Sequence, residues 1–289
     1  MVGIQKRQVT ADTSTVLNII NLRSILIVSF LVMIQLTVHA SDVLIIDGST
    51  GVKPLVESLA KYYQRANPST TIVLGTGLNP QERITALLDK EIHIAMASHG
   101  IDLKQIKEDG MVVHRIAKMA VVIGVNRSVS VGDISHSALC KIYARETTNW
   151  QTLGTANLAI KPFIRPYDEV DSEVVSAHIP CFAELQDIIN IPVMKKSGQM
   201  AKVIAQTSGA IGMTTLVRVN QSQGKIRALS IEGIAPSTSN LASGAYSLTR
   251  NSYLITAFDP SLEVAAFLEY VRSEEGAQVI ISNDAVPAF

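Results

Sequence analysis

Strand-like and helix-like segments alternate from residue 43 onward, and this alternation limits the fold more than any single motif does. The apolar runs that read as buried strands are residues 43–46, 70–74 and 92–96. Between the first two runs, Leu55, Leu59 and Tyr63 recur every four residues, the spacing of a helix with one apolar face. Strand, loop and helix in this order predict an α/β fold with parallel strands and crossover helices.

The second half of the chain continues the same pattern. The apolar run 119–125 predicts a long strand, and a second unit of strands and helices, which includes a predicted strand at 160–164, begins after it. The segment 233–250 is rich in Ser, Pro and Gly, which predicts a connection that leads back to a strand at 252–256. The stripe that predicts a core-facing final helix consists of Val264, Phe267, Leu268 and Val271.

Residues 1–40 read as a secretory signal peptide. Arg23 precedes an apolar stretch of about a dozen residues that ends at the small residue Ala40. Gln35 and Thr37 interrupt this stretch, so it is short beside the roughly 20 apolar residues of a membrane span. A retained anchor is the alternative, because the segment before Arg23 is unusually long. We expect a mature chain that begins near Ser41 and works in the periplasm.

The charge balance argues against two classes of partner. The chain has 25 basic and 25 acidic side chains, and removal of residues 1–40 takes away Lys6, Arg7, Arg23 and Asp12. The remaining 22 basic and 24 acidic groups give a net charge of −2. Such a chain has no excess of positive charge that would attract nucleic acid or an anionic membrane. Any anion site must therefore be local, built from backbone N–H groups and a few side chains.

The chain has two cysteines, Cys140 and Cys181. An oxidising compartment permits a disulfide between them, but we expect two separately buried thiols. Because no histidine cluster lies near either cysteine, we expect that the two cysteines do not form a metal site.

Three loops are candidate ligand sites, because each follows a predicted strand. They are Gly48-Ser49-Thr50-Gly51, residues 75–79 and residues 97–99. In open α/β sheets, ligands bind beyond the carboxyl ends of the strands, where unpaired helix N–H groups attract anions. The alternative is that Ser49 or Thr50 merely caps the following helix, which is a common arrangement.

Several segments together resemble the phosphate-binding proteins of ABC importers, and the resemblance extends over residues 43–288. The matching segments are 48–63 with Asn67-Pro68, 92–98, 137–143, 148–154, 208–213, 231–236, 244–248 and 274–276. Each segment alone is a weak signal, but their order and spacing are fairly specific.

The resemblance implies a two-lobed α/β architecture of the type II periplasmic binding protein-like class, with crossover strands between the lobes. One lobe is expected to contain residues 43–125 and 245–289, and the other residues 127–235. The lobes of this family close on a tetrahedral oxyanion without a metal or cofactor. Arg165 matches the arginine that pairs with phosphate oxygens, a role suited to a planar guanidinium that can donate two parallel bonds.

The ligand-binding residues that the loops and the resemblance indicate are Ser49, Thr50, Asn79, Ser98, His99, Arg165 and Ser172. The alternatives to a ligand-binding role are a solvent-exposed strand end for Arg165 and a solvent-exposed loop position for His99.

This chain differs from the family at three positions. Leu78 stands where a serine is usual, although the neighbouring Asn79 could donate instead. His99 replaces an acidic residue or an arginine, so anion discrimination there would depend on pH. The usual Ser-Gly-Thr after the arginine is replaced by residues 168–172. There Ser172 could donate to the anion, and Asp171 could accept a proton from it or simply cap a helix.

The sequence favours a binding protein over an enzyme. Within residues 1–289 there is no Gly-x-Ser-x-Gly elbow, and the six histidines show no metal-ligand spacing. We expect a monomeric extracytoplasmic protein that captures phosphate or a related oxyanion and delivers it to ABC permease subunits. A sensor or surface protein uncoupled from transport is the alternative, and a hydrolase is less favoured.

Overall fold

The computed structural model describes residues 3, 42–179, 181–184 and 190–289. All described residues except Gly3 belong to one compact unit, Ser41–Phe289. The predicted signal peptide, apart from Gly3, lies outside the described residues. Across the described ranges, no helix has both the length and the apolar character needed to cross a bilayer.

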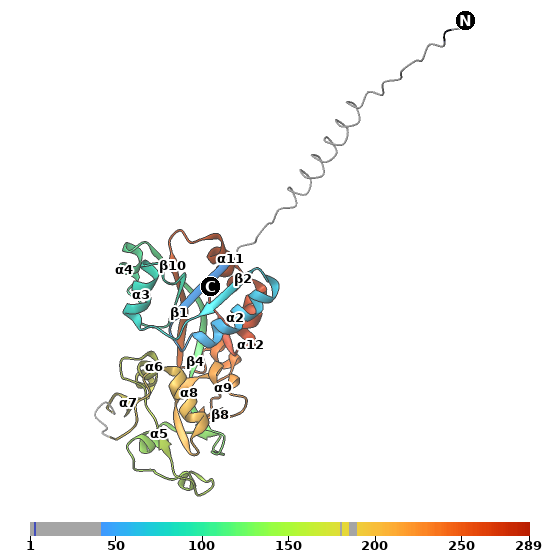
Figure 1. Ribbon diagram of the computed structural model, residues 1–289. Helices are drawn as coiled ribbons and strands as arrows, with labels where there is room; N and C mark the ends of the chain where they lie inside the picture. The colour runs from blue at the N-terminus through green and yellow to red at the C-terminus, as the bar shows by residue number, and fades with distance from the viewer. Residues whose placement is uncertain (1–2, 4–41, 180, 185–189) are drawn as a thin grey trace. The chain divides into compact units, whose positions relative to one another are not determined.

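A sheet of nine strands organises the described part of this unit (Figure 1). Its main path runs in the order β2, β1, β3, β10, β4, β7 and β6, and β8 and β11 also pair with β4. The strands are β1 (Asp42–Gly48), β2 (Thr70–Leu74), β3 (Ile94–Ala97), β4 (Met111–Asn126), β6 (Lys161–Pro162), β7 (Ala210–Thr215), β8 (Ile226–Ala228), β10 (Thr249–Ala257) and β11 (Ala285–Pro287). The short strands β5 (Asp133–Ile134) and β9 (Ser230–Ile231) form a separate pair.

The predicted parallel arrangement of the first three strands is confirmed. β1 pairs in parallel with both β2 and β3. β10 then lies between β3 and β4 and is antiparallel to each of them. The carboxyl ends of β1 and β3 therefore meet at one edge, where their loops can approach a common ligand.

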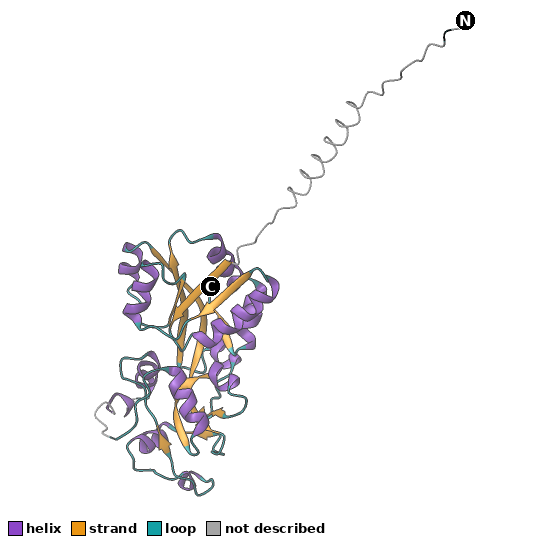
Figure 2. Cartoon of the chain, viewed as in Figure 1, coloured by secondary structure: helices purple, strands orange, loops and turns teal. Residues whose placement is uncertain are grey.

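Helices cover the sheet on both sides (Figure 2). Those of the first half are α2 (Lys53–Ala66), α3 (Pro80–Leu88), α4 (Leu103–Glu108) and α5 (His136–Tyr143), with the 3₁₀ helix η1 (Trp150–Leu153). Those of the second half are α6 (Val170–His178), α7 (Cys181–Glu184), α8 (Ser197–Gln206), α9 (Leu216–Gln221), α10 (Thr238–Ser243), α11 (Leu262–Arg272) and α12 (Glu274–Ser282). The predicted apolar stripes of α2 and α11 are confirmed, because all of their members are buried.

Strand β3 shows why both faces of the sheet are apolar. Ile94 and Met96 pack with α2 and α11, whereas Ala95 and Ala97 pack with α3 and α4. All four residues are buried. Successive side chains of a strand point to opposite faces, so a strand covered by helices on both sides is apolar throughout.

Strand β4 begins with Met111 in the small cluster around α3 and α4 and then passes through the two larger hydrophobic cores. Its residues Ile116, Ala117 and Met119 belong to what we call the β1 core, which contains residues of β1, α2, α11 and α12. From Ala120 onward the strand belongs to the β7 core, whose members all lie between Ala120 and Leu248. One continuous strand thus links the two cores.

Three elements differ from the sequence prediction in extent. The strand predicted at 119–125 begins earlier, as β4 (Met111–Asn126), because its first half pairs with β10. The strand predicted at 160–164 contains only β6 (Lys161–Pro162). The predicted connection 233–250 contains a helix, α10 (Thr238–Ser243). Its N-cap residue is Ser237, whose side chain accepts a hydrogen bond from Asn240 N.

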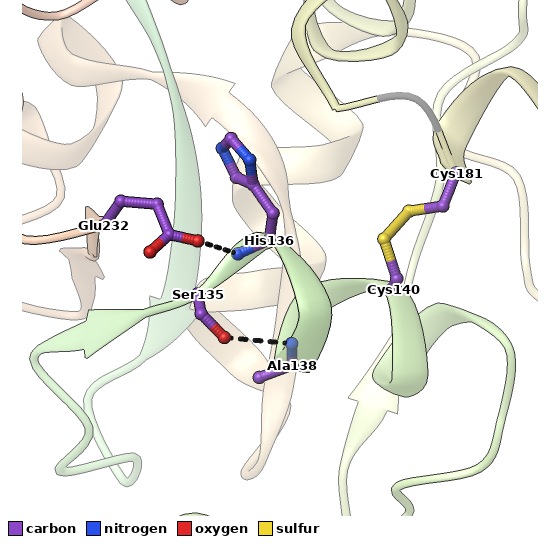
Figure 3. The surroundings of a disulfide bond; sticks show 6 residues. All are labelled: Ser135, His136, Ala138, Cys140, Cys181 and Glu232. Atoms are coloured by element: carbon purple, nitrogen blue, oxygen red, sulfur yellow. Dashed lines mark hydrogen bonds between the residues drawn. A yellow bond between two sulfur atoms is a disulfide. The ribbon is translucent and has the colours of Figure 1, made fainter.

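The two cysteines form a disulfide, so the expectation of two separate thiols was wrong. Cys140 in α5 is bonded to Cys181 at the start of α7, with a Cα–Cα distance of 5.9 Å (Figure 3). The first turn of α5 is fixed at its amino end, where Ser135 Oγ accepts from Ala138 N and Glu232 Oε1 accepts from His136 N. The sequence separation of 41 positions hid the proximity of the two cysteines.

We expect loss of this disulfide to destabilise the protein by about 2–4 kcal/mol, because the crosslink restricts the unfolded chain. The double variant Cys140→Ser, Cys181→Ser should show this loss in urea unfolding without reductant. Wild-type protein should lose a similar amount when reductant is added, and the variant should not respond. Equal stability of wild type and the double variant in the absence of reductant would contradict the prediction.

Candidate functional site

A cavity of about 150 Å³ lies at the carboxyl ends of β1 and β3. Three of the loops that line it were predicted. The helix α3 adds Pro80 and Arg83, and the remaining lining residues come from later parts of the chain. The lining consists of Gly48, Ser49, Thr50, Gly51, Gly77, Leu78, Asn79, Pro80, Arg83, His99, Arg165, Glu169, Lys195, Lys196, Ser197 and Arg250. Five of the seven predicted ligand residues are among them, and Ser98 and Ser172 are not.

The loop after β1 requires glycine at its first position. Gly48 has a φ of +130°, and a Cβ atom there would lie 2.3 Å from the carbonyl oxygen of Met96. This close approach lets Ser49 N donate to Met96 O at 2.8 Å, which fixes the loop to β3. Neither Ser49 nor Thr50 caps α2, because its N-cap is Val52 and no side chain bonds to its first turn. Neither hydroxyl group is therefore used by the helix, although Ser49 Oγ shares a hydrogen bond with Ser98 Oγ.

The second loop is fixed by a buried carboxylate. Asp47 Oδ1 accepts from Gly48 N at 2.7 Å and from Gly77 N at 2.8 Å. Asn79 lines the cavity, but its Oδ1 atom accepts from Glu82 N as the N-cap of α3. Only its amide NH₂ group is therefore left to donate to a ligand.

The third loop brings His99 to the cavity and keeps Ser98 behind it. Ser98 is buried, and its Oγ lies 3.3 Å from Ser49 Oγ. The buried Arg83 guanidinium donates to the carbonyls of His99 and Gly100 and so fixes the loop. Burial lowers the pKa of Arg83 to about 10, which leaves it charged at neutral pH.

His99 has a buried Nδ1 atom with no hydrogen-bond partner among the described residues. Burial lowers the pKa of His99, the positive charges of Arg83 and Arg250 lower it further, and Glu173 and Asp171 oppose these effects. The pKa of His99 is therefore lower than that of an ordinary histidine, which favours the neutral form of the ring.

Arg165 is buried, with 5% of its surface exposed, and lines the cavity. Its Nη1 donates to Met194 O at 2.6 Å, and its Nη2 pairs with Glu169 Oε2 at 2.8 Å. Its Nε lies 3.8 Å from Asp171 Oδ2. A guanidinium has five N–H donors, so these contacts orient Arg165 and still leave it able to donate.

Arg250 was not among the predicted residues. It comes from β10, is 5% exposed, and its Nη1 donates to Asp171 Oδ1 at 2.9 Å. Its Nη2 and Nε atoms are buried without a partner in the described part of the chain. A Cβ atom at Gly51 would lie 2.1 Å from Nη2, so Gly51 leaves the room that this arginine occupies.

The segment 168–172 has a different role from the one its position in the sequence suggested. Asp171 is only 1% exposed and contacts both Arg165 and Arg250, so it neither caps α6 nor lines the cavity. Ser172 Oγ donates to Arg165 O at 3.3 Å and lines a neighbouring, more apolar cavity with Tyr167. The structure therefore does not place Ser172 among the donors at the first cavity.

The start of α8 also reaches the cavity, through Lys195, Lys196 and Ser197. Lys196 Nζ donates to Gly77 O at 3.3 Å and to Thr76 O at 3.4 Å. This contact joins the second loop to a segment more than a hundred residues further along the chain. A Lys-Lys-Ser-Gly run before a helix was the only sequence signal for it.

The cavity is strongly cationic although the chain after residue 40 is not. Five basic side chains line it, against the single carboxylate of Glu169. Burial raises the pKa of Glu169, and the charge of Arg165 opposes that rise. The five basic residues are Arg83, Arg165, Lys195, Lys196 and Arg250. Across the described ranges no group of three or more His, Cys, Asp or Glu residues could hold a metal ion. The site is therefore suited to an anion.

Comparisons with known proteins show the family to which the chain belongs. The family described as the PBP superfamily domain matches residues 36–275. The phosphate-binding protein PstS of Bacillus subtilis (strain 168) is 28% identical over 249 residues, which cover 84% of this chain and 80% of that protein.

Two solved structures show the same fold. A candidate phosphate ABC transporter substrate-binding protein from Clostridium perfringens, solved with bound phosphate, has a TM-score of 0.69 and 20% identity, covering 86% of this chain and all of that chain. An ABC-type phosphate transport receptor from Vibrio cholerae has a TM-score of 0.55 and 21% identity, covering 84% of this chain and 99% of that chain.

We expect Asp171→Asn to lower the free energy of unfolding by about 3–5 kcal/mol, because it leaves Arg250 buried without its counter-charge. The exposed Asp168 provides the matched control. Asp168→Asn should change stability by no more than about 0.5 kcal/mol. Urea unfolding of the ligand-free proteins measures both values, and indistinguishable curves would refute the role given to Asp171.

Proposed function

Because the chain belongs to the PBP superfamily domain family, we propose that it captures a small oxyanion, with phosphate as the first choice, for an ABC importer. The observation that most supports this proposal is the meeting of five basic side chains and the uncapped first turn of α2 at one cavity. The named relatives are binding proteins of phosphate transport, and they favour neither an enzyme nor a sensor uncoupled from transport.

The ligand lies in the cavity against the loop after β1, where Ser49 and Thr50 donate to it. Arg165 and His99 face the same space. Arg250 adds a second buried guanidinium whose Nη2 atom lacks a partner among the described residues. Charge-assisted bonds of this kind are stronger than neutral ones, and burial makes them stronger still.

Two lobes enclose this ligand, residues 43–125 with 245–289 and residues 127–235. The separate β1 and β7 cores support the division. The boundary is not sharp, because Leu248 packs in the β7 core and Val217 in the β1 core.

The protein acts in the periplasm as a monomer and passes the anion to permease subunits. The signal-like residues 1–40 and the Cys140–Cys181 disulfide support an oxidising compartment. Titration calorimetry of residues 41–289 with phosphate, sulfate, molybdate and a phosphonate tests the function. Absence of heat from all four anions would refute it.

Arg165→Ala should weaken phosphate binding by about 2–4 kcal/mol, or about 30- to 1000-fold, because it removes charge-assisted hydrogen bonds. The exposed Arg127 is the matched control, and Arg127→Ala should leave the affinity within about twofold of wild type. Calorimetric titration measures both affinities. Unchanged affinity in Arg165→Ala would exclude Arg165 from the site.

Sulfate should bind more tightly to wild type than to His99→Gln only at acidic pH. Since the pKa of His99 is lowered, its ring gains charge only at acidic pH, and the added charge then favours the anion. Protonation of Glu169, whose pKa is raised, breaks its ion pair with Arg165 in both proteins. Its effect on sulfate affinity is therefore the same in wild type and variant and cancels when the two are compared. Titrations between about pH 5 and 8 check this, and parallel pH profiles would show that His99 does not face the anion.

A further inference from the structure

The amino end of α8 lies at the cavity without a side-chain cap. Its N-cap residue is Lys196, and a lysine ammonium has no lone pair with which to accept a hydrogen bond. Gln199 Oε1 accepts from Lys196 N at 3.1 Å, which satisfies only that one donor. Gln199 N donates to Lys196 O at 2.9 Å, so the N–H groups of Ser197 and Gly198 are the first-turn donors without a partner among the described residues. The first turn of α8 (Ser197–Gln206) therefore presents donors that need an acceptor.

The hydroxyl group of Ser197 independently indicates a missing partner. Ser197 is 2% exposed and lines the cavity, yet its Oγ atom has no hydrogen-bond partner in the described part of the chain. A buried hydroxyl without a partner costs about 1–3 kcal/mol, and buried polar groups are satisfied in most native structures. An anion in the cavity would supply the acceptor.

Lys196 brings a positive charge to the same place. Two of its three ammonium donors reach Gly77 O and Thr76 O at 3.3–3.4 Å. The third remains for a ligand, and the two carbonyls hold the ammonium beside the loop that also contains Asn79.

We propose, on the basis of the proposed function, that Ser197 and Lys196 at the first turn of α8 bind the oxyanion. They take the role that was expected of Ser172. Ser172 points its Oγ at Arg165 O and Met213 Sδ and does not line this cavity. The anion is thus held between the loop after β1 and the amino end of α8. A lysine and a helix N-terminus only donate, so these groups contribute no preference for a protonated oxyanion over sulfate.

The test compares phosphate binding by wild type, Ser197→Ala, Lys196→Met and Ser172→Ala in calorimetric titrations of residues 41–289. Ser197→Ala and Lys196→Met should each bind phosphate about 10- to 100-fold more weakly, the effect of losing a hydrogen bond to a charged group. Lys202→Met, an exposed position on the same helix, is the control and should stay within about twofold of wild type.

Thermal unfolding without ligand separates binding from folding. Because Ser197 Oγ is unpartnered, Ser197→Ala should leave the melting temperature unchanged or raise it while the affinity falls. Wild-type phosphate affinity in both Ser197→Ala and Lys196→Met would overturn the proposal, as would a loss confined to Ser172→Ala. These outcomes require that wild type binds phosphate. If wild type binds none of the oxyanions, the proposed function fails, and this inference fails with it.

Discussion

The carboxylate of Asp171, buried between two arginines, is the interaction on which the candidate site depends. Arg250 reaches it from β10, and Arg165 reaches it from the segment between β6 and α6. Two buried guanidinium groups without a counter-charge would repel each other and would lose hydration with no compensation. One carboxylate offsets part of this cost and joins two distant parts of the chain. It leaves the surrounding cavity positively charged, as an anion site requires.

The sequence was most informative where the site follows from local geometry. Parallel strands end at the same edge, so the loops after β1 and β3 could be placed together, and Ser49, Thr50 and His99 do line the cavity. Arg250 and the start of α8 were missed for a physical reason. Their proximity depends on an antiparallel strand and on a helix packed from far along the chain. The Cys140–Cys181 disulfide was misjudged for the same reason.

Ser172 shows the limit of matching residues by their order alone. It was predicted as a donor because residues 168–172 stand where the resemblance places a Ser-Gly-Thr after the arginine. In this chain Glu169 pairs with Arg165 and Asp171 with Arg250, and the first turn of α6 then points Ser172 toward Met213. Charged residues inserted into a donor loop can thus hold the arginine and displace the hydroxyl group. No propensity or periodicity argument contains this information.

The position of β10 in the sheet has a consequence for the order of events during synthesis. β10 (Thr249–Ala257) separates β3 from β4, so these strands cannot complete their pairing until most of the chain has been made. Val264, Phe267 and Val271 of α11 then close the β1 core around residues made some two hundred positions earlier. Non-local pairing of this kind is slow, and it exposes apolar strands in the meantime. A chain emerging amino end first must therefore stay unfolded, or be held by a chaperone, until its carboxyl-terminal segment arrives.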